Sequence, residues 1–163
     1  REVVTLIILE LTKLEKTNIF AANGEEIVTM QPSVTEFFHE TTGTFSYVLA
    51  DAATREAAVI DAVLNYDPRT ARTSTQFADR IVAHARENNL HVRWVLETHA
   101  HADHVSAGAY LRDTFGAQLA IGSGIKKVQA TFKQIFNLGE DFKPDGSQFD
   151  RLLQDGETFA IGT

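Results

Sequence analysis

The chain of 163 residues contains no cysteine. Disulfide bonds, thiolate zinc sites and a cysteine nucleophile are therefore excluded, and any sulfur chemistry must use a thiol that the substrate brings. Basic residues are few as well, because 15 Lys and Arg stand against 22 Asp and Glu, a formal net charge of −7. A nucleic-acid partner needs a basic surface, so this balance argues against one. The composition is typical of a soluble intracellular domain, and we expect a cytoplasmic protein.

The chain also lacks a long apolar run. Residues 3–9 are apolar but much too short to span a bilayer, so we expect no membrane partner. They also lack the basic start and the longer apolar core of a secretory signal. Met30 is the only methionine, and we interpret it as the native start. Residues 1–29 are then an extension of uncertain status, a possible non-native leader, or alternatively a strand or helix that packs on the domain formed by residues 30–163.

Three histidines and one aspartate occur within the seven residues 98–104. Neutral imidazole and carboxylate are ligands that zinc and iron prefer, and affinity grows when one segment supplies several. In an extended backbone alternate side chains share a face. We therefore expect His99, His101 and Asp103 to project together and His104 to face elsewhere. The composition of this segment predicts a metal site.

The cluster lies between a predicted strand at residues 92–96 and a predicted helix at residues 106–115, which Gly116 ends. The junction of a strand with a helix is the usual place for ligands in α/β proteins. Asp103 could instead cap this helix, but capping explains none of the histidines. The other histidines stand alone and are interpreted as packing or surface residues: His39, His84 and His91.

The run T-H-A-H-A-D-H resembles the T-H-x-H-x-D-H signature of the metallo-β-lactamase-fold superfamily at every fixed position, and residues 57–61 resemble its first motif, a strand that ends in an aspartate. The resemblance implies an α/β fold, the N-terminal half of an αββα sandwich. It implies that Asp61 and Thr98 support the metal loop without binding metal. Asp103 is the candidate catalytic residue. The metal ligands that the resemblance implies are His99, His101, Asp103 and His104.

The residues after the signature indicate a subgroup. Thioesterases of the glyoxalase II type usually continue with a Gly-Gly-Asn-like stretch, whereas residues 105–111 read V-S-A-G-A-Y-L. Together with residues 46–51 and 63–70, this stretch is most similar to the persulfide dioxygenases, which oxidise glutathione persulfide to sulfite with one Fe(II). The resemblance then implies that His99, a later histidine and a later aspartate hold the iron. His101, Asp103 and His104 would shape the pocket, and the substrate-binding residues are unknown.

Two alternatives stay open. A glyoxalase II-like hydrolase of glutathione thioesters, or of related esters and lactones, would hold two Zn²⁺, one at His99 and His101 and one at Asp103 and His104. The family carries further ligands in its second half, yet no histidine follows His104. The chain is therefore expected to be truncated at its C-terminus, and the second alternative is a non-catalytic fragment or half-domain that needs a partner chain. Formation of a homodimer is left open.

Hydrophobic periodicity predicts the remaining elements. Residues 66–72 and 141–150 are interpreted as exposed polar loops. A strand pair is expected around the turn at Asp155 and Gly156. Further strands are expected at residues 34–38, 45–51, 57–61 and 118–121, and further helices at residues 75–89 and 125–136.

Overall fold

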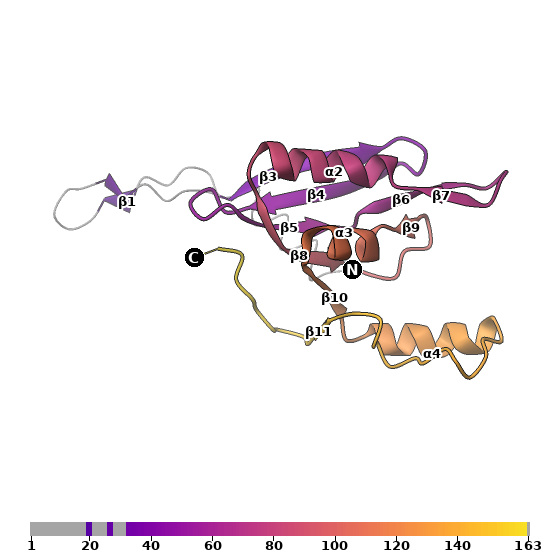
Figure 1. Ribbon diagram of the computed structural model, residues 1–163. Helices are drawn as coiled ribbons and strands as arrows, with labels where there is room; N and C mark the ends of the chain where they lie inside the picture. The colour runs from indigo at the N-terminus through magenta and orange to yellow at the C-terminus, as the bar shows by residue number, and fades with distance from the viewer. Residues whose placement is uncertain (1–18, 21–25, 28–31, 163) are drawn as a thin grey trace.

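The computed structural model describes residues 19–20, 26–27 and 32–162 (Figure 1). Its centre is a six-stranded sheet with the strand order β11-β10-β8-β5-β4-β3. Strands β3, β4 and β5 pair antiparallel, whereas β5, β8, β10 and β11 pair parallel. The six strands are β3 (Ser33–His39), β4 (Thr44–Ala50), β5 (Glu56–Ile60), β8 (His91–Glu97), β10 (Gln118–Gly122) and β11 (Arg151–Leu153).

A smaller antiparallel sheet has the order β7-β6-β9 and consists of β6 (Val63–Asp67), β7 (Arg72–Ser74) and β9 (Val105–Ser106). A separate pair joins β1 (Ile19–Phe20) to β2 (Glu26–Ile27). Apart from this pair, the expectations for the leader at residues 1–29 and for the start at Met30 lie outside the described residues.

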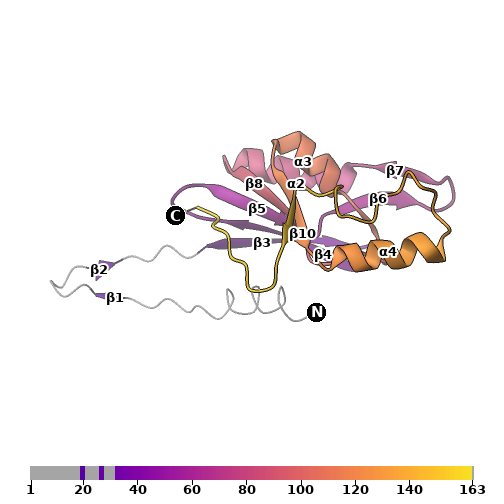
Figure 2. The same cartoon turned by 90° about the horizontal axis from the view of Figure 1, so that it is seen from below.

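Helices α2 (Gln76–Glu87) and α3 (Gly108–Phe115) cover one face of the large sheet, and α4 (Ile125–Ile135) follows β10 (Figure 2). Successive side chains of a strand point to opposite faces, so alternate strand residues meet the helices. In the described ranges, none of the helices combines the length and the apolar character needed to cross a membrane. The core on this face includes Phe37, Val48, Val59 and Val95 from the sheet, Phe77, Ile81 and Val82 from α2, and Leu111 from α3.

The opposite face of the sheet carries apolar side chains that remain accessible. Phe38 and Phe45 are 44% and 43% exposed, and their ring centroids lie 4.9 Å apart on β3 and β4. They alternate with Phe37 and Ser46, which are buried on the helix side. In the αββα sandwich expected from the sequence, this is the face that meets the second sheet.

Most of the predicted elements are confirmed to within two residues. Gly116 ends α3 in the left-handed conformation (φ 64°), as expected. Helix α3 begins at Gly108 with Ala107 as its N-cap, so Asp103 does not cap it.

One of these predictions is wrong, and another is confirmed only in part. No second strand follows β11 among the described residues up to 162, and Gly156 lies in a turn with φ 72°. Strand β11 instead finds a parallel partner in β10, where Ile121 pairs with Leu152. The segment at residues 66–72 is exposed, as expected, but only residues 68–71 form a turn, because its ends belong to the β6–β7 hairpin, in which Tyr66 pairs with Thr73.

Candidate metal centre

The centre forms where two neighbouring strands end. Strands β5 and β8 are parallel, with Ile60 opposite Leu96, so their carboxyl ends lie at the same edge of the sheet. The backbone N–H of Asp61, the residue after β5, donates to the Leu96 carbonyl at 2.9 Å. Asp61 is thereby placed beside the loop at residues 98–104 that follows β8, as expected for ligands at the carboxyl ends of parallel strands.

The loop at residues 98–104 is held at its far end as well. Strand β9 pairs with β6, with Val105 opposite Leu64, and the Ala107 N–H donates to the Ala62 carbonyl at 2.7 Å. Between these anchors the backbone bends and has no strand geometry. The expected alternation of side chains is therefore wrong for His104, whose ring centroid lies 4.2 Å from that of His101.

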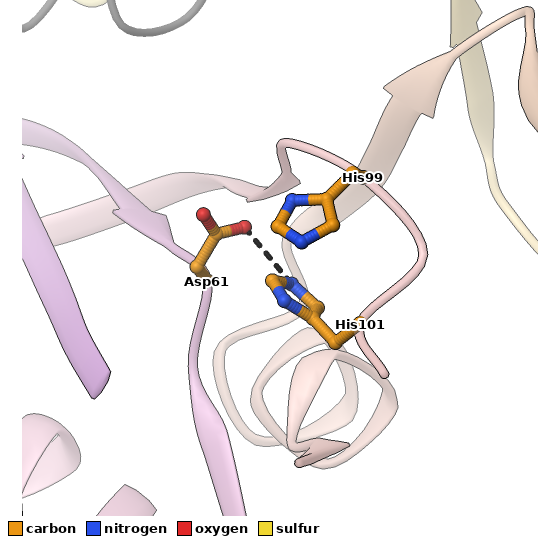
Figure 3. Close-up of side chains that lie close together, drawn as sticks. All are labelled: Asp61, His99 and His101. Carbon is orange, nitrogen blue, oxygen red and sulfur yellow. Dashed lines mark hydrogen bonds and ion pairs between the residues drawn. The ribbon is translucent and has the colours of Figure 1, made fainter. Parts of the chain in front are cut away.

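Asp61 organises the start of the loop. Its φ of 51° lies in the left-handed region, which Asp adopts more readily than most residues. Its carboxylate accepts the Thr98 N–H and the Thr98 hydroxyl, both at 2.7 Å, and lies 3.1 Å from His101 Nε2 (Figure 3). Burial raises the pKa of Asp61, but the hydrogen bonds from His101 and Thr98 outweigh it and lower the pKa. Both carboxylate oxygens are engaged, so Asp61 holds the loop as an ionised acceptor.

Thr98 links Asp61 to His99. Because the Thr98 hydroxyl donates its hydrogen to Asp61, its oxygen can only accept from His99 Nδ1, which lies 2.7 Å away. The proton of a neutral His99 therefore resides on Nδ1. This arrangement leaves the lone pair of His99 Nε2 for a metal, in the usual way that a hydrogen bond orients a histidine ligand.

His101 is held through its other nitrogen. His101 Nε2 lies 2.8 Å from Glu97 Oε2 and 3.1 Å from Asp61 Oδ1, and its side chain is 5% exposed. Since carboxylates only accept, Nε2 carries a proton and Nδ1 is the atom available to a metal. Burial lowers the pKa of His101, but its hydrogen bonds to Asp61 and Glu97 outweigh burial and raise it to about 10. The metal-free protein therefore holds this imidazole as a cation.

His104 and Asp103 form a second pair. His104 Nδ1 lies 3.1 Å from Asp103 Oδ2, which also accepts the Thr44 hydroxyl at 3.0 Å. The hydrogen bond from His104 lowers the pKa of Asp103 to about 2. The His104 side chain is 1% exposed, and its Nε2 has no hydrogen-bond partner within the described part of the chain. A buried polar atom without a partner is unfavourable, so this nitrogen fits a site for a metal ligand.

These side chains form two groups, and within each group the possible ligand atoms all lie within 4.8 Å of one another. The first group is Asp61, His99 and His101, and the second is His101, Asp103 and His104. Imidazole nitrogens with carboxylate oxygens suit zinc or iron, so the residues fit a metal of either kind. The structure thus brings together all the residues singled out from the sequence: Asp61, Thr98, His99, His101, Asp103 and His104.

A pocket of about 360 Å³ opens beside the second group. Sequence reasoning treated His39 as a packing residue, and it is buried, yet it also lines this pocket. His39 Nε2 accepts from Asn65 Nδ2 at 3.1 Å, so its Nδ1 carries the proton and donates to Thr42 at 2.8 Å. Burial lowers the pKa of His39, which keeps it neutral. The other lining residues include Leu64, Tyr66, Asp103, His104 and Val105.

Two residues of the centre were not predicted from the sequence: Glu97, which contacts His101, and Thr44, which contacts Asp103. A signal was present, because Glu97 follows the buried Val95 by two positions on β8 and so shares its face toward the core. Thr44 could not have been found, since it lies 59 residues from Asp103.

Raising the pH is expected to destabilise the metal-free protein through His101. The pKa of His101 rises from 6.5 to about 10 on folding, so its stabilising contribution is fully present below about pH 6.5 and is lost as the pH rises toward 10. Thermal unfolding of the metal-free wild type and of His101→Gln between pH 6.5 and 10 measures this. The difference in Tm should shrink as the pH rises, and a constant difference would contradict the ion pair.

Comparison with known proteins places these motifs in a family. Residues 40–162 match the family model of the metallo-beta-lactamase superfamily. A "Probable metallo-hydrolase" of Burkholderia pseudomallei (strain 1710b) is 49% identical over 130 residues, 80% of this chain and 44% of that protein. Glyoxylase B2 of Dictyostelium discoideum is 49% identical over 117 residues, which are 71% of this chain and 40% of that protein. The mitochondrial persulfide dioxygenase ETHE1 of Homo sapiens is 30% identical over 128 residues, which are 78% of this chain and 38% of that protein.

The chain spans less than half the length of these curated relatives. Among solved structures, the BLEG-1 B3 metallo-beta-lactamase matches with a TM-score of 0.50 and 20% identity, over 80% of this chain and 57% of that one. At this identity the likeness concerns the fold, and it agrees with the α/β architecture expected from the sequence. Because the matched family range contains both Asp61 and the loop at residues 98–104, the chain belongs to the metallo-beta-lactamase superfamily.

Proposed function

We propose that the complete protein is an iron-dependent dioxygenase that oxidises glutathione persulfide to sulfite. The reaction is GSSH + O₂ + H₂O → GSH + SO₃²⁻ + 2 H⁺, in which O₂ takes up the electrons that the outer sulfur loses. Support comes from the similarity to a persulfide dioxygenase over 78% of this chain and from the hydrogen bonds around the predicted ligands. The absence of cysteine agrees with a thiol supplied by the substrate.

In this proposal His99 binds the iron through Nε2, the nitrogen that the Thr98 hydrogen bond leaves free. The remaining ligands, as the family resemblance implies, are a histidine and an aspartate outside these 163 residues. When bound, Fe(II) supplies the redox chemistry between O₂ and the persulfide sulfur. His101 contributes Nδ1 to the wall of the site, because its Nε2 is committed to Glu97 and Asp61.

The hydrogen bonds that Asp103 accepts from His104 and Thr44 are the observation that carries the proposal. One of its oxygens already accepts from His104 and Thr44, which suits a residue that shapes the pocket. A pKa near 2 keeps Asp103 ionised at neutral pH, so it accepts hydrogen bonds and does not act as a general acid. As the candidate catalytic residue, Asp103 would orient His104 toward the substrate pocket.

The pocket also restricts which part of the substrate it can hold. Its volume of about 360 Å³ lies within the range of pockets for small ligands. Among the described residues that line it, none is Lys or Arg, so it suits the sulfur end of the substrate better than its carboxylates. The β6–β7 hairpin that supplies Tyr66 also carries exposed Arg69 and Arg72, which could bind those carboxylates.

A dinuclear zinc hydrolase of glutathione thioesters is the second candidate. The observation in its favour is the second ligand group, which contains Asp103 and the unpartnered Nε2 of His104. In this alternative His99 and His101 hold one zinc, and Asp103 and His104 hold the other. The name of the relative from Burkholderia, a probable metallo-hydrolase, agrees with a metal-dependent hydrolase.

Metal content and oxygen consumption of the full-length protein separate the candidates. We expect about one iron per chain and uptake of one O₂ for each sulfite formed from glutathione persulfide. Two zinc ions, hydrolysis of a glutathione thioester and no O₂ uptake would replace the proposal by the hydrolase. A folded protein without either activity would favour a non-catalytic half-domain.

A further inference from the structure

We propose that Glu97 is a positioning residue that fixes the orientation of His101 and presents its Nδ1 to the metal. Glu97 belongs to β8 and lies four residues before His101, outside the family signature that identifies the ligands. The inference rests on the metal arrangement of the second candidate function, in which His99 and His101 hold one ion, and it is independent of the substrate.

Glu97 is buried at the end of its strand. The residue is 7% exposed, and its Oε2 lies 2.8 Å from His101 Nε2. Its other oxygen, Oε1, accepts the hydroxyl of Ser106, the last residue of β9. Each oxygen therefore has its own donor, so the carboxylate cannot turn without breaking one of the two bonds.

The neighbouring backbone leaves room for this carboxylate only because residue 108 is glycine. A Cβ at Gly108 would lie 2.5 Å from Glu97 Oε1, 2.9 Å from Leu119 Cδ1 and 3.0 Å from Ser106 Oγ. The Gly108 N–H donates to Ser106 Oγ at 2.8 Å, which fixes the hydroxyl that faces Glu97. Only glycine fits at this position, and Ser106 and Gly108 together form a cradle for the Glu97 carboxylate.

Asp61 alone would hold His101 less firmly. Asp61 Oδ1 is shared between the Thr98 N–H at 2.7 Å and His101 Nε2 at 3.1 Å, whereas Glu97 Oε2 makes the shorter bond to the ring. Both carboxylates contact the same nitrogen, Nε2, and carboxylates only accept, so the proton of a metal-binding His101 stays on Nε2. Nδ1 is then the nitrogen left for a metal, the usual way in which a carboxylate orients a histidine ligand.

The test measures cobalt(II) affinity of the full-length protein by competition with a chelating dye. Glu97→Ala is expected to weaken binding by about 10- to 100-fold, the usual loss when a partner of a histidine ligand is removed. Glu97→Gln keeps a carbonyl oxygen for the His101 N–H and should stay within about tenfold of the wild type. Glu56→Gln is the matched control on β5, where Glu56 pairs with Arg93 at 2.9 Å, and should leave the affinity unchanged.

A second readout reports the orientation directly. In ¹⁵N NMR spectra of the zinc-loaded wild type, His101 should show a protonated Nε2 and a metal-bound Nδ1, and Glu97→Ala should lose this single tautomer. Gly108→Ala should weaken cobalt binding as well, because its methyl group displaces the Glu97 carboxylate. Gly124→Ala, where a Cβ meets nothing within 4 Å, is its control.

Two outcomes would overturn the proposal. The first is wild-type cobalt affinity in a folded Glu97→Ala protein, whether or not its Tm falls. The second is an equal loss in Glu97→Gln and Glu97→Ala, which would assign the effect to charge and not to position. A wild type that binds cobalt but consumes no O₂ would refute the dioxygenase proposal alone, so the two failures are distinguishable.

Discussion

His99→Ala in the complete protein is expected to abolish turnover and to lower the bound metal. The substitution removes the imidazole whose Nε2 is left free by the hydrogen bond between His99 Nδ1 and Thr98. A catalytic metal contributes several kcal/mol to stabilisation of the transition state. Its loss therefore corresponds to a decrease in kcat/KM of about a thousandfold or more. Steady-state kinetics together with metal analysis measure both effects.

His91→Ala is the matched control for this substitution. His91 begins the same strand, β8, and is exposed at the end remote from the metal loop. Its turnover and metal content should equal those of the wild type. Retained turnover in His99→Ala would refute the assignment of His99 as a ligand in both the iron and the zinc proposals.

Asp61→Ala is expected to have the largest effect on stability. It removes the acceptor of two hydrogen bonds from Thr98 and one from His101. It also places alanine at a φ of 51°, which is unfavourable for a residue with a Cβ and no polar side chain. We expect a loss of about 3 kcal/mol in the free energy of unfolding, together with loss of tight metal binding.

Asp61→Asn separates the backbone effect from the hydrogen bonds. Asparagine also tolerates the left-handed conformation and can accept the Thr98 N–H, but its amide group cannot accept the Thr98 hydroxyl. The metal-free variant should unfold at a urea concentration between those of wild type and Asp61→Ala. Equal midpoints for Asp61→Asn and Asp61→Ala would show that the acceptor for the Thr98 hydroxyl and the negative charge account for the whole loss. A wild-type midpoint for Asp61→Ala would contradict the role of Asp61.

The pH dependence of these variants has a defined sign. The pKa of Asp61 is lowered on folding, so its contribution to stability is present above the pKa of the unfolded chain and is lost as the pH falls through the lower folded value. The difference in free energy of unfolding between wild type and Asp61→Asn should therefore decrease in acid. Urea titrations at several pH values would measure it, and a difference that grows in acid would contradict the assignment.

The elements that could be predicted from the sequence are those whose residues interact locally. The apolar stripe of α2 and the glycine that ends α3 were both recognisable, because their causes lie within one or two turns of the chain. The pairing of β11 could not be predicted, since its partner β10 lies about 30 residues earlier and joins it in parallel. The turn at Gly156 is real, yet no hairpin surrounds it in the described residues.

By itself, the sequence determined the chemistry of the centre, because imidazole and carboxylate ligands are a property of the residue types in one short segment. The tertiary structure alone decided which nitrogen of each histidine is free. For His99 and His101 this choice depends on Asp61, which lies 37 residues before Thr98 and 40 before His101. The tertiary structure also places His104 beside His101, because the loop between β8 and β9 is anchored at both ends and must bend. The prediction from the sequence pattern assumed an extended strand instead.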